Sequence, residues 1–430
     1  MRSMQSIRPD RQRGAAALIV VVVLFFILAM VTAYAGRNLI FEQRTSVNNL
    51  RAVQALEIAE SGLEYAISRF GIGRVDDQCL PTADVGQNTF RDRYTTQLGD
   101  GRFEVAGAKV GLQPTCMLLS TGPSCSCPAA GAPNLIDPVG LAPTFQLTFN
   151  TTGIAQAGIV RVTSRGCSSI GKQCYDPRLN DADAVAQVSV LLGLNSALAT
   201  PPSAPLVVRG SLNANAGQLG VVNTDPPTRG VTIDAGGLVT NSGNLRLSTL
   251  PGTPGSASIL ASDTSLSTLS ADRMFVSVFG MDRETYRSQP AAIRITCAGD
   301  CSTAIADAAS TNPGRVVWAQ GPVSIDSNIV LGSPATPLLL VVQGDLTVAA
   351  NVTLHGVLYL HDPSTDPNHA ITWSTTAGST TIHGAVVAER NLSVAGGPTV
   401  IFNPAVLRTI NLTQGSLVRV PGSWNDFAGS

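Results

Sequence analysis

The chain has 430 residues, of which 44% are hydrophobic, 13% are charged and 5% are aromatic, and its formal net charge is -1. This length is enough for two or three domains. The low charge, together with 41 glycines and 26 prolines, favours a body rich in strands and turns over a helical bundle. No basic patch is interleaved with aromatic residues, so the composition argues against nucleic acid as a partner.

An uncharged apolar run at residues 15–35 is the strongest local signal. About twenty such residues cross a bilayer as a helix, so the run predicts a membrane span. Four arginines and one aspartate precede it, which predicts a cytoplasmic N-terminus and an outside location for the remainder. A secretory signal peptide is the alternative, but its apolar core is shorter and is followed by a small-residue cleavage site.

Beyond residue 36, apolar residues recur three or four positions apart as far as Phe70, and no proline follows the apolar run before Pro81. This spacing predicts one helix over residues 15–70, roughly 80 Å long at 1.5 Å per residue. Most of such a helix must find partners outside its own chain. The residues expected to pack in the membrane or in a filament are Ile19, Leu24, Phe25, Leu28, Leu39, Leu50, Leu56 and Leu63.

The residues around the start of the apolar run carry a family resemblance. A basic leader ends in Arg13 and Gly14, the helix begins directly at Ala15, and residues 52–63 read Ala-Val-Gln-Ala-Leu-Glu-Ile-Ala-Glu-Ser-Gly-Leu. This pattern resembles the N-terminus of type IV prepilins, and residues 12–20 are most similar to the PilX-type minor pilins. The resemblance, which covers residues 11–70, implies cleavage by a prepilin peptidase after Gly14 and N-methylation at Ala15. It also implies packing beside other minor pilins and the major pilin.

Ile19 departs from the pattern of most pilins, which carry a glutamate as the fifth residue after the cut. A carboxylate inside lipid is costly unless it is paired, and in the family it is thought to meet the N-terminal ammonium of a neighbouring subunit. The PilX-type proteins, and the minor pseudopilin at the tip of type II secretion systems, often lack it too. The resemblance therefore implies a tip or initiation subunit. The alternative is that Ile19 is an ordinary lipid-facing residue of an ordinary anchor.

All of the cysteines follow the predicted span, and their number is even, which predicts disulfides in an oxidising compartment. The closest neighbours in sequence, Cys167 with Cys174 and Cys297 with Cys301, are expected to form local loops, and the other pairings stay open. Zinc is the alternative, but the four histidines lie far away and no pair of CxxC motifs exists. We predict no metal site and no cofactor. The disulfide candidates are Cys79, Cys116, Cys125, Cys127, Cys167, Cys174, Cys297 and Cys301.

Residues 71–195 are expected to form a compact pilin-like head with disulfides. The turn at residues 99–101 predicts a hairpin, and later strands are expected at residues 145–149, 158–164 and 184–192. Residues 116–133 predict a stapled surface loop because they are rich in Gly, Pro, Ser and Ala. Residues 196–205 are predicted to form a linker because they are rich in proline.

Residues 206–430 contain an internal repeat. Strand–turn–strand segments starting near residues 206, 316, 340 and 385 resemble one another, and copies recur about 20 to 28 residues apart. Such repeats predict a β-solenoid in which each coil pairs with the next, with a β-sandwich as the alternative. A short helix is expected within residues 266–286, and residues 424–430 are expected to cap the open end. His355 and His383 recur before glycines, which predicts stacking at a corner of the coil.

The sequence contains neither an HExxH zinc-protease motif nor a GxSxG nucleophile elbow, so we predict a structural protein and not an enzyme. One loop that contains proline could hold calcium through oxygen ligands, although a solvated loop is the preferred interpretation. Its residues are Asp362, Asp366, Asn368 and His369.

The complete prediction is an α+β protein. It has a leader at residues 1–14, a transmembrane and amphipathic helix at 15–70, a head at 71–195, a linker at 196–205 and a stacked β domain at 206–430. Its function would be that of a minor pilin: an inner-membrane single-pass precursor with a periplasmic C-terminal part, later at the pilus tip or cell surface. The alternatives are a pseudopilin of a type II secretion system, or an adhesin that binds a surface glycan through the C-terminal β domain.

Overall fold

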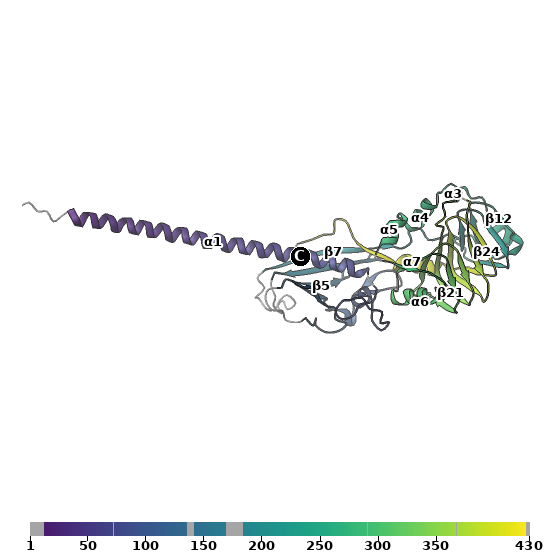
Figure 1. Cartoon of the computed structure of the whole chain (residues 1–430), viewed down its shortest axis with the longest axis horizontal. Coiled ribbons are helices and arrows are strands. Elements are labelled where there is room, and N and C mark those ends of the chain that lie inside the picture. Colours follow the sequence, from purple (N-terminus) through teal and green to yellow (C-terminus); the bar gives the residue numbers. More distant parts are fainter. Residues whose placement is uncertain are drawn as a thin grey trace, which may run out of the picture.

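The computed structural model describes residues 13–71, 73–135, 142–168, 184–289, 291–366 and 368–426, with the side chains of residues 13–16 and 216 left out. Three parts follow one another along the long axis (Figure 1): a long helix, an antiparallel head and a solenoid of parallel strands. The predicted α+β class, with these three parts, is confirmed.

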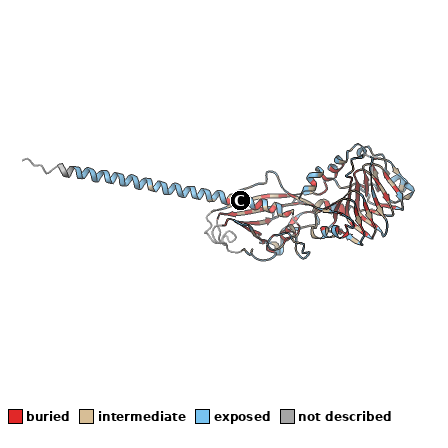
Figure 2. Ribbon diagram, viewed as in Figure 1, coloured by how far each residue is buried: buried red, intermediate tan, exposed pale blue. Residues whose placement is uncertain are grey.

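Helix α1 (Arg13–Phe70) is continuous, as the absence of proline predicts. Its C-terminal quarter packs on the head sheet through a stripe of small and apolar residues that includes Ala55, Ala59 and Ala66. Gly62 makes this approach close, because a Cβ atom there would lie 2.9 Å from the Phe145 ring. The N-terminal part of α1 projects away from the head and is exposed (Figure 2).

The head is built on an antiparallel sheet with the strand order β26-β7-β6-β5-β3-β4. Its strands are β3 (Thr115–Leu119), β4 (Gly122–Ser126), β5 (Thr144–Asn150), β6 (Ile159–Cys167), β7 (Val185–Ser196) and β26 (Gly415–Arg419). The last three strands predicted for the head are confirmed as β5, β6 and β7. The prediction of a loop at residues 116–133 is wrong in its first half, which pairs as the β3–β4 hairpin.

Short elements close the other side of the head. They are α2 (Phe90–Tyr94), η1 (Gly107–Lys109) and the hairpin of β1 (Thr96–Gln97) with β2 (Phe103–Glu104). The predicted hairpin is confirmed, although it is shorter than expected because residues 90–94 are helical. Phe70 at the end of α1 meets Phe90 and Phe149 edge to face, which joins helix, short elements and sheet in one core.

The solenoid has three faces, one formed by β12-β9-β24-β22-β20-β17 and two by a second sheet. The second sheet divides along β21, because β18 pairs with β21 before Gly356 and β19 pairs with it from Gly356 onward. Gly356 and its neighbour Gly384 in β23 both have positive φ, and a Cβ atom at Gly356 would lie 1.7 Å from the Leu338 carbonyl oxygen. All pairings between these strands are parallel, which favours the solenoid over the sandwich.

The strands before the helical insertion are β8 (Leu206–Val208), β9 (Leu212–Ala216), β10 (Leu219–Val222), β11 (Ile233–Ala235), β12 (Val239–Thr240), β13 (Leu245–Ser248) and β14 (Ile259–Leu260). Those after it are β15 (Ala292–Thr296), β16 (Val316–Gln320), β17 (Val323–Ile325), β18 (Ile329–Leu331), β19 (Leu338–Gln343), β20 (Leu346–Val348), β21 (Val352–His361), β22 (Ala370–Thr375), β23 (Thr380–Ala388), β24 (Asn391–Ala395) and β25 (Thr399–Phe402).

The coils do not stack in chain order. The first coil, β8-β9-β10, pairs on one side with the second coil and on the other with β23, β24 and β25 of the last coil. The expectation that each coil pairs with the next is therefore wrong at this seam. The reason is a crossing: after β14 the chain leaves the stack through α3 (Thr264–Ser267), α4 (Ala271–Phe279) and α5 (Arg283–Ser288), and re-enters it as the edge strand β15. The predicted helix in residues 266–286 is thus confirmed as a set of short helices.

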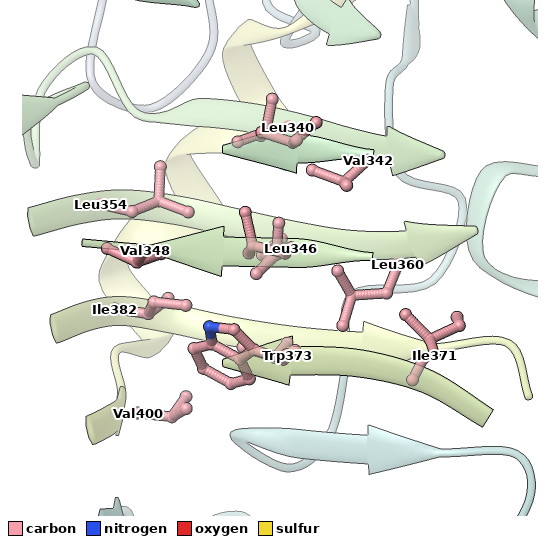
Figure 3. Close-up of a cluster of buried hydrophobic side chains, with 14 of the residues drawn as sticks. Leu340, Val342, Leu346, Val348, Leu354, Leu360, Ile371, Trp373, Ile382 and Val400 are labelled. Atoms are coloured by element: carbon pink, nitrogen blue, oxygen red, sulfur yellow. The ribbon is translucent and has the colours of Figure 1, made fainter. Parts of the chain in front are cut away.

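Alternating Leu, Val and Ile side chains fill the solenoid interior, together with the fully buried Trp373 (Figure 3). One outer face is also buried, because α4, α5 and α7 (Pro404–Thr413) cover it. Strands buried on both sides read as continuous apolar runs, which explains residues 338–342 and 357–360. Helix α6 (Ser302–Thr311) adds Ile305 and Ala308 to the interior core.

The chain returns to the head after the solenoid. Strand β26 pairs antiparallel with β7, and Asn425 forms a bridge with Ser189. The solenoid is therefore an insertion between two neighbouring strands of the head, and the predicted domain at 206–430 loses its last residues to the head. The expectation that residues 424–430 cap the solenoid is wrong for residues 424–426, and residues 427–430 lie outside the described part.

Candidate functional site

The N-terminal part of α1 is the largest exposed apolar surface of the described chain (Figure 2). Among the residues predicted to pack, those in this part have 53% to 70% of their surface exposed: Ile19, Leu24, Phe25, Leu28, Leu39 and Leu50. An apolar surface of this size is unfavourable in water, so lipid or other chains must cover it. The helix Ala17–Phe70 is also the one in the described residues that is long and apolar enough to cross a membrane.

Two residues of the predicted packing surface contact their own head instead. Leu56 is partly buried there, and Leu63 retains only 1% exposure in the head core. The prediction that Leu63 packs against another subunit is therefore wrong. An amphipathic stripe indicates that a helix face is covered, but it does not indicate whether the covering chain is its own.

The implied processing site lies at the start of α1. The helix begins at Arg13 and continues through Gly14 and Ala15, but the side chains of these residues and the preceding leader lie outside the description. Cleavage at Gly14 stays a prediction. Ile19 is exposed, and residues 15–35 contain no charged residue, so the described part of this stretch presents an apolar surface.

The exposed side of the C-terminal part of α1 is acidic. Glu57, Glu60 and Glu64 lie on it, and together with Trp424 and Arg419 they line a groove along the helix. Arg419 of β26 forms an ion pair with Glu64. The C-terminal return segment therefore forms one wall of this groove on α1.

The disulfides of the described residues stabilise the head and one coil. Cys79 bonds to Cys127, Cys116 to Cys125, and Cys297 to Cys301, the last as predicted. The predicted pairing of Cys167 with Cys174 cannot be followed because Cys174 lies outside the described residues.

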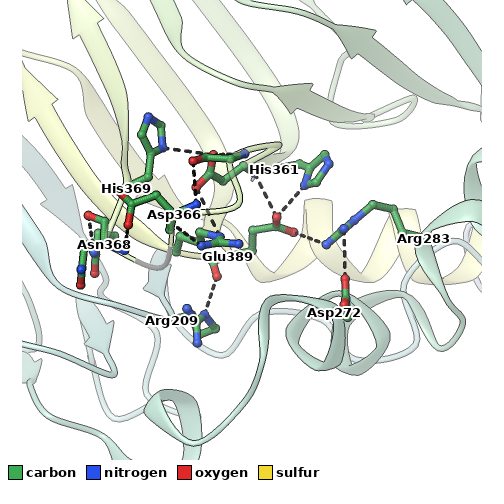
Figure 4. Close-up of polar contacts among 12 residues, drawn as sticks. Arg209, Asp272, Arg283, His361, Asp366, Asn368, His369 and Glu389 are labelled. Carbon is green, nitrogen blue, oxygen red and sulfur yellow. Dashed lines mark hydrogen bonds and ion pairs between the residues drawn. The ribbon is translucent and has the colours of Figure 1, made fainter.

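A buried polar cluster joins the solenoid to its covering helices (Figure 4). The Glu389 side chain is completely buried, and its carboxylate accepts hydrogen bonds from Arg283 at 3.1 Å and from the Tyr359 hydroxyl at 3.0 Å. His361 Nδ1 lies 2.5 Å from Glu389 Oε1, and the Asp362 amide donates to the same oxygen at 3.0 Å. Four donors of the same chain use both oxygens, so this carboxylate fixes α5 to β21 and β23. Burial, followed by the nearby Glu389 charge, raises the pKa of Tyr359 well above its ordinary value.

The loop that was considered for calcium is held by the protein itself. Asp362 is buried, lies 3.3 Å from Arg390 Nε and 3.1 Å from His369 Nδ1, whereas Asp366 and Asn368 are exposed. The preferred interpretation as a solvated loop is thus wrong for Asp362. Among the described residues, no group of three or more His, Cys, Asp or Glu side chains is placed to hold a metal ion.

His355 and His383 stack as predicted, with ring centroids 4.8 Å apart. Burial and the neighbouring His383 lower the pKa of His355. The distance between the two rings matches the spacing of neighbouring strands in a sheet, so the stack fits a structural role at a corner of the coil.

Sequence reasoning missed Gly62 and the Glu389 cluster. Both leave a signal in the chain: an isolated glycine inside an apolar helix indicates close packing, and single ionisable residues follow apolar strands at Arg209, His361 and Glu389. Arg209 Nε donates to the Glu389 carbonyl at 2.6 Å across the seam between the first and last coils. Since these residues lie up to 180 positions apart, spacing alone could not bring them together.

No family model matches the chain, and no curated protein matches it. Among solved structures, the competence-associated pilin ComZ from Thermus thermophilus is similar at 11% identity, over 87% of this chain and 97% of that chain, with a TM-score of 0.23. Chains with so low a TM-score do not superpose as one fold, so this similarity decides neither fold nor function.

Proposed function

We propose that this chain is a minor pilin that is anchored in the inner membrane, helps to initiate a type IV filament and lies at or near its tip. The prepilin-like pattern at Arg13, Gly14 and Ala15 supports this proposal, as does the exposed apolar part of α1. Its partners would be the prepilin peptidase, other minor pilins and the major pilin.

The observation that favours the tip is the position of the solenoid. It lies beyond the C-terminal end of α1 and in line with that helix in the view of Figure 1. In a filament of parallel, axially staggered helices, a subunit added above would place its own helix in the volume that the solenoid occupies. Neighbours can instead pack along the N-terminal part of α1, below the head. Such a subunit ends a filament and does not continue it.

Labelling of the distal solenoid tests this position. Ser242 is exposed in η3 (Ser242–Asn244) of the distal coil, and the described cysteines are all in disulfides, so Ser242→Cys adds a free thiol to the described part of the chain for biotin and gold. We expect gold at the ends of isolated filaments and none with the unsubstituted chain. Gold spaced along the shaft would contradict the tip position.

A pseudopilin of a secretion system would share the N-terminal features and differ in its partners. Co-purification of the full chain with either pilus or secretion subunits separates the two functions. Binding of a surface glycan by the solenoid is compatible with a tip subunit, and no single contact in the described residues favours it.

A further inference from the structure

The solenoid is connected to the head at two chain crossings that lie side by side. Ser196, the last residue of β7, is the pairing partner of Gly415, the first residue of β26. All residues between these two positions leave the head. The main chain therefore carries a pull on the solenoid into the head sheet through both strands at one point, beside hydrogen bonds from Arg74 to Ser310 and from Arg91 to Thr413.

The strands are oriented to resist such a pull. Strand β7 and α1 both follow the long axis of the molecule (Figure 1). Nine residues of β6 and five of β26 pair with β7, all antiparallel. Hydrogen bonds between antiparallel strands are perpendicular to the strands, so a pull along the axis acts on all of them in shear.

Side chains from the covering helices attach directly to both crossings. Ser196 Oγ donates to Asn411 Oδ1 of α7 at 2.8 Å, and the Tyr286 hydroxyl of α5 donates to the Ala197 carbonyl at 2.9 Å. On the second crossing, Ser416 Oγ donates to Gln289 Oε1 at 2.8 Å. These bonds hold the solenoid on the strand ends, and they begin within residues 196–205, which were predicted to be a linker.

The opposite end of the sheet is attached to α1 by a covalent staple. Nine residues after Phe70, Cys79 bonds to Cys127, which directly follows β4 at the far edge of the sheet. The buried Arg93 guanidinium reinforces this connection by donating to the Val75 carbonyl at 2.6 Å. Tension in α1 therefore reaches the sheet through a disulfide as well as through the main chain.

We propose that the β7–β26 pair is a two-path joint that transmits tension from the distal solenoid to α1. Both crossings share the load, so the solenoid separates from the head only when β26 and β7 yield together. This inference concerns the isolated chain and holds whether or not the chain is a filament subunit, so its failure and the failure of the proposed function are separate results.

Single-molecule pulling on the full chain in detergent micelles tests the joint. Handles are placed at Arg44→Cys on exposed α1 and at Ser242→Cys on the distal coil, and residues 200–203, which are at the surface, are replaced by a site-specific protease sequence. The cut is made after folding, so a misfolded variant cannot account for the result. The uncut protein with the same site, and the unsubstituted linker treated with protease, are the matched controls.

After the cut, β26 is the one main-chain connection between the solenoid and the head, and only hydrogen bonds, such as those of Ser196 and Ala197 to α7 and α5, remain at the first crossing. We expect the rupture force to fall roughly twofold, because one of two parallel sheared paths has been removed. An unchanged force would show that the first crossing carries no tension. Separation without measurable force would show that β26 carries none. Either result overturns the two-path joint.

Discussion

Replacement of Glu389 by alanine is expected to make the solenoid unfold far more easily. The carboxylate has no exposed surface and accepts four hydrogen bonds, so its loss leaves Tyr359, His361 and a backbone amide without this acceptor, and leaves Arg283 with Asp272 alone. Removal of one partner from a buried ion pair costs 3–5 kcal/mol in other proteins, so we expect Glu389→Ala to lower the free energy of unfolding by about 4 kcal/mol. Glu389→Gln keeps an acceptor but not the charge, and should lower it by about half as much.

The assay is equilibrium unfolding in urea, followed by tryptophan fluorescence. Trp318 and Trp373 are completely buried in the solenoid, so their emission reports its unfolding. Glu284 provides the matched control: it lies one residue from Arg283, its side chain is 73% exposed, and it forms an ion pair with Arg287. Glu284→Ala should change the free energy of unfolding by less than about 0.5 kcal/mol. A loss below about 1 kcal/mol for Glu389→Ala would refute the view that this cluster fixes the helices to the coils.

Three further predictions concern other parts of the chain. Gly62→Ala should destabilise the head by about 1–3 kcal/mol, because the new Cβ overlaps Phe145 and Ser164, whereas Gly36→Ala, with nothing within 4 Å, should leave thermal unfolding of the head unchanged. Removal of the Cys79–Cys127 disulfide, whose cysteines are 48 residues apart, should cost about 4 kcal/mol of unfolding free energy by the chain-entropy relation, and a loss below 1 kcal/mol would contradict it. Burial, and then Asp263, raise the pKa of Asp234 to about 6, so between pH 4 and 6 the unfolded chain loses this proton first and stability falls as the pH rises. Asp234→Asn should therefore stabilise the distal coil at pH 7 and not at pH 4, and an equal effect at both values would refute this assignment.

The elements with strong local signals could be predicted from the sequence. Continuous helix over residues 15–70 follows from spacing and the absence of proline, and strands β5, β6 and β7 follow from their β-branched residues. The stacked coils follow from their repetition. In each case a few neighbouring residues decide the structure, so no knowledge of distant contacts is needed.

The elements that depend on distant partners could not be predicted. Strand β26 begins more than 200 residues after the linker that was predicted to end the head. The local sequence pattern of β26 does not show which strand it pairs with. The last coil pairs with the first because α3, α4 and α5 carry the chain across the stack, and repeat spacing does not reveal this order. Disulfide pairing of Cys79 with Cys127 was likewise open, since the number of cysteines does not fix connectivity.

The mature N-terminus is the most direct test of the pilin proposal. It is measured by mass spectrometry of the full chain from cells with and without a prepilin peptidase. The proposal predicts a methylated terminus at Ala15 that depends on the peptidase. An intact leader, or a cut after the apolar run, would contradict it.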